Sequence, residues 1–436
     1  MLRFNENNEI IREDEYDAII VGLYRGRDTE RSMDELEGLC EADGISVLGR
    51  VVQDPEKPNT ATLIGKGKVE ELAEVCRNMG ADTVVFNDEL SGVQIRNLEE
   101  ALDVRVIDRT VLILDIFADR ATSREGKLQV ELAQLQYRMP RLTGFGKSLS
   151  RLGGGIGTRG PGEKKLETDR RHIASRIDDI KAELRKLEKN RKVQSAGRSK
   201  SGVPVVALMG YTNSGKSAIM NYMIRMTDEG DEEKTVSSRD MLFATLDTQH
   251  RKIVPEPGNE FLLIDTVGFV SGLPHSLVEA FKSTLDEVRA ADLLIHVADS
   301  SSDDCDFRIK VTEKVIGEIG AGGLPVIMAY NKCDLKQPDM TGSGGDYVVP
   351  VSAKTGENMD LLVRKIEEML FSDRVRAEFV IPYDKGGITS ELCEKGRIES
   401  MEYEERGTVI RGMFDREDFG RYEKYGTIQD SGETGV

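Results

Sequence analysis

One short segment limits the possible fold of this chain more than any other: the eight residues GYTNSGKS, from Gly210 to Ser217. They follow the apolar run VPVVALMG, a strand candidate, and they precede a helical pattern. A GxxxxGK[ST] sequence in that context is the phosphate loop of nucleotide-binding α/β domains. We therefore expect an α/β domain that binds a nucleotide where this strand meets the helix.

The residues of this loop have separate tasks in the prediction. Gly210 and Gly215 allow the tight turn whose backbone amides surround the phosphates. Lys216 supplies a positive charge to the β- and γ-phosphates, and Ser217 offers its hydroxyl to Mg²⁺. The residues expected at the nucleotide here are Gly210, Tyr211, Thr212, Asn213, Ser214, Gly215, Lys216, Ser217 and Ala218.

A second motif, DTVG from Asp265 to Gly268, closes the apolar run FLLID. Asp265 would lie at the carboxyl end of a strand and bind Mg²⁺ through water, and the N–H of Gly268 would approach the γ-phosphate. In the segment MLFATLDT we expect Thr245 to reach Mg²⁺ and the γ-phosphate, with Thr248 as the alternative. The predicted catalytic residues are Lys216, Thr245 and Gly268, and the predicted metal ligands are Ser217, Thr245 and Asp265.

Two further motifs select the base. NKCD follows the strand candidate PVIMAY, and SAK follows VVPV. The carboxylate of Asp334 can accept the N1–H and the exocyclic amine of guanine, whereas adenine would leave this partly buried acid unpaired. The backbone of the SAK loop would meet guanine O6. The predicted base-binding residues are Asn331, Lys332, Asp334, Ser352, Ala353 and Lys354, so GTP is the predicted substrate and Mg²⁺ the predicted cofactor.

The residue that follows DTVG is Phe269. Many regulatory GTPases have a glutamine at this point, which orients the attacking water. A phenyl ring cannot form a hydrogen bond to that water. The sequence therefore predicts slow intrinsic GTP hydrolysis that a partner accelerates, either by ordering the mobile segments or by donating a catalytic group.

The length of 436 residues predicts two to four domains. Apolar strand candidates alternate with helical patterns between residues 16 and 108, which indicates a small domain with a mostly parallel sheet. The expected fold class is α/β and multidomain. Its parts are an N-terminal α/β domain at residues 1–120, a helical hairpin with a glycine-rich loop at 121–200, the P-loop GTPase domain at 201–373 and a small C-terminal α+β domain with a tail at 374–436.

Charge is distributed unevenly along the chain. The formal net charge is −18, yet residues 138–200 contain 18 Lys and Arg against 7 Asp and Glu. In the same region, Leu166, Ile173, Ile177, Ile180, Leu184 and Leu187 recur at the spacing of a helix that packs on another helix. The hairpin is therefore predicted to be a basic element, with either a solvated helix face or a nucleic-acid surface as its role.

Other features point to fewer functions. The five cysteines have no disulfide or zinc spacing, and the four histidines have no partner at catalytic spacing. No run of apolar residues approaches the length of a membrane span, and the amino terminus lacks a signal peptide. We expect a cytoplasmic protein without a membrane span, a monomer by default, and we do not expect DNA as a partner. The tail from Gly426 is predicted to be disordered.

Several longer segments resemble the HflX family of ribosome-associated GTPases. They are LIGKGKVEEL, VFNDELSGVQIRNLE, VIDRTVLILDIFADRA, GGGIGTRGPGEKKLE and DTVGFVSGLPHSLVEAFKSTL. Lys164 and Lys165 depart from the family pattern, which usually has threonine and glutamine there, and the acidic stretch at residues 227–233 is longer than usual. Phe269 is not a departure, because the family is similar in using an apolar residue at that position.

The resemblance implies a factor that binds the large (50S) ribosomal subunit and its rRNA, and that splits stalled or stressed ribosomes in a GTP-dependent way. The basic, glycine-rich hairpin agrees with RNA contact, and the expected phosphate contacts are Arg151, Arg159, Lys164 and Lys165. Two alternatives remain open: an RNA-remodelling NTPase that also uses the N-terminal domain, and a nucleotide-switched module that binds a protein partner.

Overall fold

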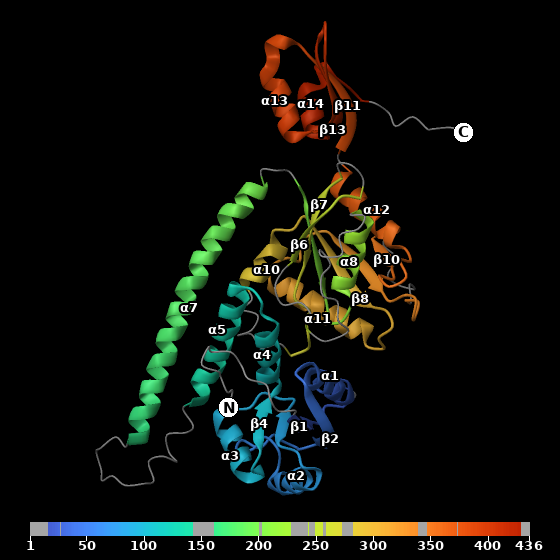
Figure 1. Cartoon of the computed structure of the whole chain (residues 1–436). Helices are drawn as coiled ribbons and strands as arrows, with labels where there is room; N and C mark the ends of the chain where they lie inside the picture. The colour runs from blue at the N-terminus through green and yellow to red at the C-terminus, as the bar shows by residue number, and fades with distance from the viewer. Residues whose placement is uncertain are drawn as a thin grey trace.

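The computed structural model describes residues 16–26, 28–142, 161–199, 203–227, 243, 249–255, 259–272, 282–338, 347–372 and 374–428. Three sheets follow one another along the chain, and Figure 1 shows the second between the first and the third. We call the three parts the N-terminal domain (residues 16–120), the central domain (203–372) and the C-terminal domain (374–428). The predicted fold class, multidomain α/β, is confirmed, whereas the exact domain boundaries stay a prediction.

The N-terminal domain has a fully parallel sheet in the order β2-β1-β3-β4. Strands and helices alternate, as the apolar pattern predicts, because parallel neighbours need a crossover connection. The elements are β1 (Tyr16–Leu23), α1 (Asp28–Ala42), β2 (Ile45–Gln53), α2 (Lys66–Met79), β3 (Thr83–Phe86), α3 (Gly92–Leu102) and β4 (Arg105–Asp108).

The helix that follows, α4 (Arg109–Arg120), was not predicted from periodicity. Eight of its residues are buried, from Arg109 to Phe117, so it lacks the polar face that marks an amphipathic helix. Its start is fixed by Asp108, whose side chain accepts a hydrogen bond from the N–H of Val111. This helix, together with α1, lies against the central domain.

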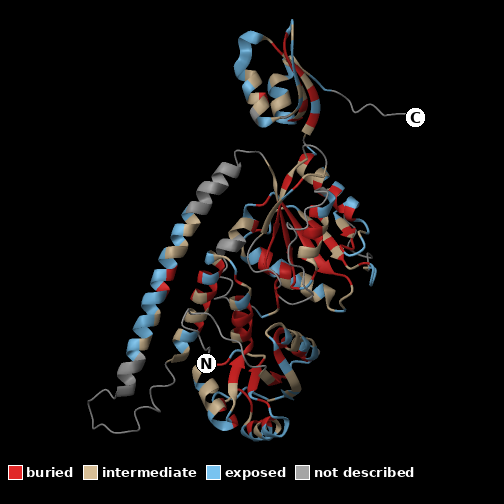
Figure 2. Cartoon of the chain, in the orientation of Figure 1, coloured by how far each residue is buried: buried red, intermediate tan, exposed pale blue. Residues whose placement is uncertain are grey.

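The predicted hairpin consists of α5 (Arg124–Arg141) and α7 (Pro161–Ser199). Figure 2 shows α7 exposed along most of its length, with burial confined to the side that packs on α5. The contact joins Leu128 and Leu132 of α5 to Ile177 and Ile180 of α7, with Ile173, Leu184 and Leu187 beside them. The glycine-rich loop and the side chain of Leu166 lie outside the described residues.

The central domain is built on a six-stranded sheet in the order β10-β9-β8-β5-β7-β6, parallel except for β6. Its strands are β5 (Val205–Gly210), β6 (Gln249–Ile253), β7 (Phe261–Asp265), β8 (Leu293–Asp299), β9 (Val326–Asn331) and β10 (Val348–Pro350). Its helices are α8 (Lys216–Thr227), α10 (Lys282–Arg289), α11 (Cys305–Glu318) and α12 (Met359–Phe371). The sequence predicts a helix over residues 276–289, of which the structure describes 282–289.

The C-terminal domain is a four-stranded antiparallel sheet in the order β12-β13-β11-β14. Its elements are β11 (Arg374–Ile381), η3 (Tyr383–Lys385), α13 (Gly386–Lys395), β12 (Arg397–Glu404), β13 (Gly407–Asp415), α14 (Arg416–Tyr422), η4 (Glu423–Tyr425) and β14 (Gly426–Ile428). The prediction of a disordered tail from Gly426 is wrong for its first three residues, because they add an edge strand to β11. The residues beyond Ile428 lie outside the described part.

One hydrophobic cluster crosses from the N-terminal domain into the central domain. It joins Leu112, Ile116 and Phe117 of the first to Tyr211, Phe243, Val267 and Val270 of the second. Phe117 and Phe243 meet edge to face, with ring centroids 4.6 Å apart and an interplanar angle of 81°. The N-terminal domain therefore packs on the segments that contain the phosphate loop and DTVG.

Candidate nucleotide site

The phosphate loop connects β5 to α8, in the strand-loop-helix context that the motif requires. Gly215 has φ +91°, and a Cβ there would lie 2.1 Å from Nδ2 of Asn331. A Cβ on Gly210 would lie 2.2 Å from the carbonyl oxygen of Val297. Both glycines are thus required by close approach to neighbouring groups, and Asn213 also has a positive φ of 58°.

Lys216 is buried inside this loop, with 6% of its surface exposed. Its Nζ donates to the carbonyl oxygens of Gly210 at 3.1 Å and Tyr211 at 3.0 Å. Burial lowers the pKa of Lys216 to about 8, although the charge of Asp265 opposes the shift. The hydroxyl of Ser214 is also buried, with no hydrogen-bond partner among the described residues. A buried ammonium and a buried hydroxyl in one loop fit a polyphosphate.

The side chains of Ser217 and Asp265 lie beside each other at the ends of α8 and β7. Ser217 Oγ donates to Asp265 Oδ2 at 2.6 Å, and Asp265 is fully buried. These two hard oxygen donors fit Mg²⁺ shared with nucleotide phosphates and water. Within the described ranges no group of three or more His, Cys, Asp or Glu could hold a metal ion. Thr245 and Thr248 lie outside the described residues.

The segment after β7 lies directly on the phosphate loop. The N–H of Thr212 donates to the carbonyl oxygen of Phe269 at 2.7 Å, and the N–H of Phe269 donates to that of Gly210 at 3.2 Å. A Cβ on Gly268 would lie 2.7 Å from Cα of Thr212 and 3.2 Å from Nζ of Lys216. Gly268 therefore stands next to the lysine that would bind the β- and γ-phosphates.

Phe269 points away from this site. It is 4% exposed and belongs to a hydrophobic cluster with Met209, Val288 and Leu294. Its ring is therefore part of the core, and it cannot orient a water molecule at the γ-phosphate.

The base-selecting motifs lie at the ends of β9 and β10. Asn331 donates from Nδ2 to the carbonyl oxygen of Ser214 at 2.9 Å and accepts at Oδ1 from the N–H of Ala353 at 3.1 Å. This one buried amide thus ties the phosphate loop, NKCD and SAK together. Lys332 Nζ lies 2.8 Å from Oδ2 of Asp299.

The burial of some predicted residues differs from what the sequence predicts. Asp334 is exposed, whereas the argument for guanine treated it as partly buried. Lys354 is also exposed, while Ser352 is fully buried and accepts from the N–H of Thr355 at 3.2 Å. Ala218 packs against the core of the central domain. The remaining motif residues that the structure describes come together around one loop.

Three family models match the chain in order. They are described as GTP-binding GTPase N-terminal (residues 30–118), GTP-binding GTPase middle region (120–198) and 50S ribosome-binding GTPase (205–332). GTPase HflX of Caldanaerobacter subterraneus is 48% identical over 92% of this chain and 92% of its own length. GTPase HflX of Escherichia coli is 40% identical over 91% of this chain and 93% of its own length.

The chain belongs to the HflX family of GTPases. It is accordingly an enzyme that converts GTP to GDP and phosphate. A solved GTP-binding protein of Sulfolobus solfataricus in complex with GDP is 24% identical, with 82% of this chain and 99% of that chain covered. The TM-score of that structure is 0.45. In the part of this HflX chain that the structure describes, no helix is long and apolar enough to cross a membrane.

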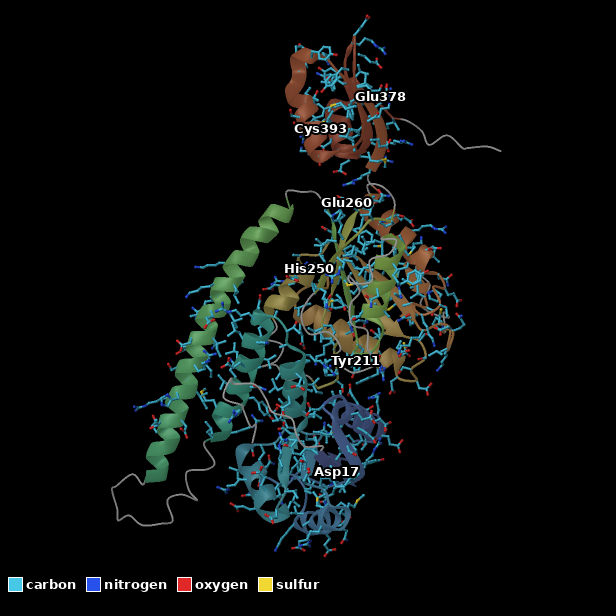
Figure 3. The ribbon with its side chains drawn as sticks, viewed as in Figure 1. Asp17, Tyr211, His250, Glu260, Glu378 and Cys393 are labelled. Atoms are coloured by element: carbon cyan, nitrogen blue, oxygen red, sulfur yellow. The ribbon has the colours of Figure 1, made fainter. Side chains whose placement is uncertain are left out.

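Sequence reasoning missed a polar network between the N-terminal domain and the nucleotide site of this HflX protein. Glu35 of α1 accepts hydrogen bonds from the hydroxyls of Tyr211 and Ser271. Arg109 of α4 lies 2.5 Å from Oε2 of Glu35 and donates to the carbonyl oxygen of Ser271 at 3.0 Å. Figure 3 shows Tyr211 on the side of the central domain that faces the N-terminal domain. The network links residues far apart in sequence, and the family segments include two of them, Arg109 in VIDRTVLILDIFADRA and Ser271 in DTVGFVSGLPHSLVEAFKSTL.

The charge of Arg109 and the neighbouring hydrogen bonds keep Glu35 ionised in this network. Burial would raise the pKa of Glu35, but the charge of Arg109 and the hydrogen bonds from Ser271 and Tyr211 outweigh it, so the pKa lies below its ordinary 4.5. Burial and the neighbouring charge of Glu35 raise the pKa of Tyr211. Tyr211 therefore remains a neutral hydrogen-bond donor to a carboxylate at neutral pH.

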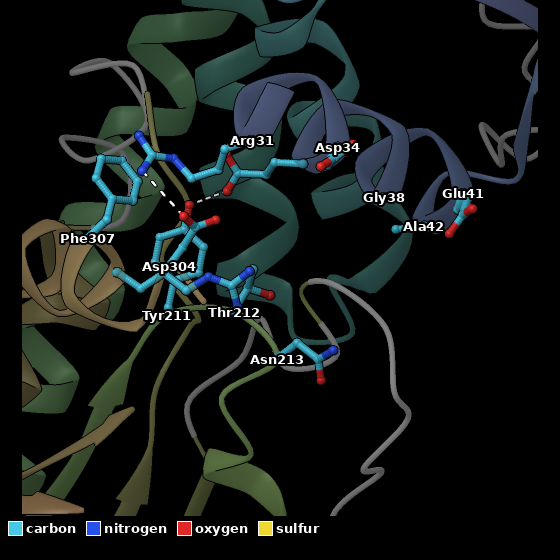
Figure 4. Close-up of a pocket in the computed structure, with 12 residues that line it drawn as sticks. Arg31, Asp34, Gly38, Glu41, Ala42, Tyr211, Thr212, Asn213, Asp304 and Phe307 are labelled. Atoms are coloured by element: carbon cyan, nitrogen blue, oxygen red, sulfur yellow. Dashed lines mark hydrogen bonds and ion pairs between the residues drawn. The ribbon is translucent and has the colours of Figure 1, made fainter. Parts of the chain in front are cut away.

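A cavity of about 390 Å³ lies beside this network, between α1, the phosphate loop and the start of α11. Figure 4 shows Thr212 and Asn213 of the loop on one side of it and α1 on the other. The guanidinium of Arg31 lies 3.6 Å from the ring centroid of Phe307, and that of Arg308 lies 5.3 Å from the ring centroid of Tyr211. The cavity belongs to the same contact between the two domains.

Proposed function

We propose that this GTPase binds the large ribosomal subunit and splits or rescues ribosomes under stress, with hydrolysis stimulated by the ribosome. The burial of Phe269 in the core supports stimulated hydrolysis, because the site then contains no side chain at that position to orient water. Support also comes from the description of the central family model, a 50S ribosome-binding GTPase.

We further propose the predicted roles for the site residues. Lys216 binds and neutralises the β- and γ-phosphates, the N–H of Gly268 donates to the γ-phosphate, and Ser217 with Asp265 holds the metal. Mg²⁺, when bound, neutralises the charge that develops on the phosphate oxygens. Thr245 completes the metal site when its segment is ordered, and the base is bound by Asn331, Lys332, Asp334, Ser352, Ala353 and Lys354.

The hairpin is the proposed RNA contact. The exposed basic residues of α7 that the structure describes include Arg170, Arg171, Lys181, Arg185, Lys186 and Lys189, and they lie away from the seam with α5. A row of cations on one helix attracts a phosphate backbone and makes the affinity depend on salt. Ribosomal RNA fits this surface, because it offers folded backbone at the scale of a long helix.

Nucleotide choice is tested with Asp334→Asn. Asn cannot accept both N–H groups of guanine, so GTP affinity should fall by about 100-fold or more. Asp360→Asn is the matched control, because Asp360 is an exposed carboxylate at the start of α12, away from the nucleotide motifs. Equal binding of ATP and GTP by the unaltered protein would favour an RNA-remodelling NTPase instead.

Ribosome splitting is tested on sucrose gradients of 70S ribosomes mixed with the protein and GTP, GDP or a non-hydrolysable GTP analogue. Subunits should separate with GTP or the analogue, and GTPase turnover should rise when 50S subunits are added. Absence of subunit separation under every nucleotide condition would contradict the proposal. A protein that binds GTP but neither ribosomes nor RNA would point to a module for a protein partner.

The RNA contacts are tested by replacing Arg151, Arg159, Lys164 and Lys165 together with Ala. Binding to 50S subunits should weaken, and its dependence on salt concentration should become shallower. The matched control replaces Lys310, Lys314, Arg406 and Lys424 with Ala, which removes the same charge from exposed positions outside the hairpin. Equal losses in both variants would assign the effect to total charge and would contradict a role for the loop residues.

A further inference from the structure

Two residues of the N-terminal domain, Glu35 and Arg109, contact the two segments that would surround the γ-phosphate. These segments are the phosphate loop and the segment that begins with DTVG. Glu35 accepts from the hydroxyl of Tyr211, which is in the phosphate loop. Glu35 also accepts from the side chain of Ser271, and Arg109 donates to the carbonyl oxygen of Ser271 at 3.0 Å. Ser271 lies three residues after Gly268, so the DTVG segment is fixed at its far end by another domain.

The phosphate loop and the DTVG segment are also joined to each other beside Glu35. The N–H of Ser271 donates to the hydroxyl of Tyr211 at 2.7 Å. Tyr211 is thus at once a phosphate-loop residue, a donor to Glu35 and an acceptor from the DTVG segment. A change in the position of either segment must break or lengthen bonds to the N-terminal domain.

The burial of these hydrogen bonds makes them sensitive to the positions of the two segments. The side chains of Glu35 and Arg109 are 13% and 7% exposed, so water does not readily replace a lost partner. Arg109 is further held by Asn87, whose Oδ1 accepts from Nη1 at 3.0 Å. The network therefore favours one geometry of the phosphate loop and the DTVG segment over others.

We propose that Glu35 and Arg109 are positioning residues of the GTPase site, which hold Gly268 where it binds the third phosphate and so couple docking of the N-terminal domain to GTP. The proposal rests on the proposed roles of Gly268 and Lys216. In the docked arrangement a Cβ on Gly268 would lie only 3.2 Å from Nζ of Lys216, so both groups face one small volume.

The direction of the coupling follows from which phosphates each group meets. The loop amides bind phosphates that GDP and GTP share, and Lys216 reaches the shared β-phosphate as well as the γ-phosphate, whereas Gly268 meets only the γ-phosphate. Loosening Gly268 therefore weakens GTP binding and leaves GDP binding nearly unchanged. Linkage is reciprocal, so GTP must strengthen docking of the N-terminal domain by the same factor.

The contact of Phe243 also supports stronger docking of the N-terminal domain in the GTP state. Phe243 lies two residues before Thr245 in the sequence, and its N–H donates to Oγ of Thr212 at 2.8 Å. Its ring packs on Phe117 of the N-terminal domain. The docked N-terminal domain thus contacts the segment whose threonine would bind Mg²⁺ in the GTP state.

The test measures equilibrium affinities of the full-length protein for GDP and for a non-hydrolysable GTP analogue. Glu35→Gln should weaken analogue binding by about tenfold, within the usual range of coupling between sites, and change GDP binding by less than about twofold. Glu37→Gln is the matched control, because Glu37 lies on the same helix and pairs with Arg50 of its own domain. Equal affinity changes for the two nucleotides in Glu35→Gln would overturn the proposal.

A double-mutant cycle separates positioning from general damage. Tyr211→Phe removes the hydroxyl that links Glu35 to Ser271, so the double variant Glu35→Gln with Tyr211→Phe should lose little more analogue affinity than either single variant. Fully additive losses would show that the two residues act independently and would contradict the network.

The reciprocal effect is measured by hydrogen exchange of α1 and α4. The GTP analogue should slow exchange in these helices more than GDP does, and Glu35→Gln should abolish the difference. Identical protection by both nucleotides in the unaltered protein would overturn the coupling. If the protein bound neither nucleotide, the proposed nucleotide site would fail instead, which keeps the two outcomes distinct.

Discussion

The central domain meets its two neighbours in different ways. Towards the N-terminal domain it has a shared hydrophobic cluster and the buried ion pair of Glu35 with Arg109, which reaches Tyr211 and Ser271. Towards the C-terminal domain the structure places the guanidinium of Arg374 4.8 Å from the ring centroid of Phe371. The core of the C-terminal domain, which includes Phe379 and Phe414, is a cluster of its own.

This difference indicates which neighbouring domain is coupled to the nucleotide site. A buried, directional contact has few alternative arrangements, so a shift of the phosphate loop changes the contacts of the N-terminal domain. Figure 1 shows the C-terminal domain at the opposite end of the molecule. The ion pairs among its described residues join groups of the same domain, such as Arg376 with Glu399. We expect it to respond little to the nucleotide.

The largest expected effect breaks the buried pair. Arg109→Ala leaves the Glu35 carboxylate buried without its cation, which should lower the stability of the docked N-terminal domain by about 3–5 kcal/mol. Denaturant unfolding followed by separate probes in the N-terminal and C-terminal domains would measure it. The probe in the C-terminal domain serves as the internal control. An unchanged transition in the N-terminal domain would show that the pair does not stabilise this contact.

A smaller effect compares two aromatic pairs of similar geometry. Phe243→Leu removes the edge-to-face contact with Phe117 and should weaken docking by about 1–2 kcal/mol, with reduced affinity for the GTP analogue. Phe379→Leu is the matched change in the C-terminal domain, where Phe379 and Phe414 lie 4.8 Å apart at 86°. It should lower the stability of that domain by a similar amount and leave nucleotide affinity unchanged. Loss of nucleotide affinity in Phe379→Leu would break the comparison.

The sequence predicted the nucleotide site far better than this domain contact. GYTNSGKS, DTVG and NKCD are contiguous because backbone and side chains of one short segment surround a phosphate or a base. The network of Glu35, Arg109 and Ser271 has no such constraint, since each residue comes from a different element. Tyr211 shows both cases, because its backbone position was predictable from the motif and its hydroxyl contact was not.

Two strands were missed for a related reason. β6 and β14 lie at the edges of their sheets, where one side of the strand has no ladder and little burial is required. Their sequences, QHRKI and GTI, lack the apolar run that reveals a central strand. α4 was missed because it is buried on nearly every side.

The third prediction uses pH to sharpen the contrast within the N-terminal domain. The folded-state pKa of Glu35 is lowered from 4.5, so its stabilisation is complete above pH 4.5 and is lost as pH falls through the lowered value. Asp108 has the opposite sign. Burial raises its pKa above 3.8, so its relative contribution is greatest below pH 3.8 and declines as pH rises through the raised value.

Unfolding of the unaltered protein, Glu35→Gln and Asp108→Asn between pH 3 and 7 checks these signs. Glu35→Gln should flatten the loss of docking in acid, whereas Asp108→Asn should steepen it. The same pH slope in Glu35→Gln and the unaltered protein would mean that the Glu35 carboxylate does not hold the domains together through its charge.

The smallest expected effect tests the other side of the comparison. Arg376 of β11 pairs with Glu399 of β12 at 2.6 Å, but its side chain is 52% exposed. Water screens such a pair and the long side chain loses freedom when it forms, so Arg376→Ala should lower the stability of the C-terminal domain by about 0.2–1 kcal/mol. GTP affinity and hydrogen exchange in α1 should remain unchanged, in contrast to the variants of Glu35 and Arg109. A change in nucleotide affinity with Arg376→Ala would show that the C-terminal domain is coupled to the phosphate loop after all, and that burial of the connecting charges is not what decides the coupling.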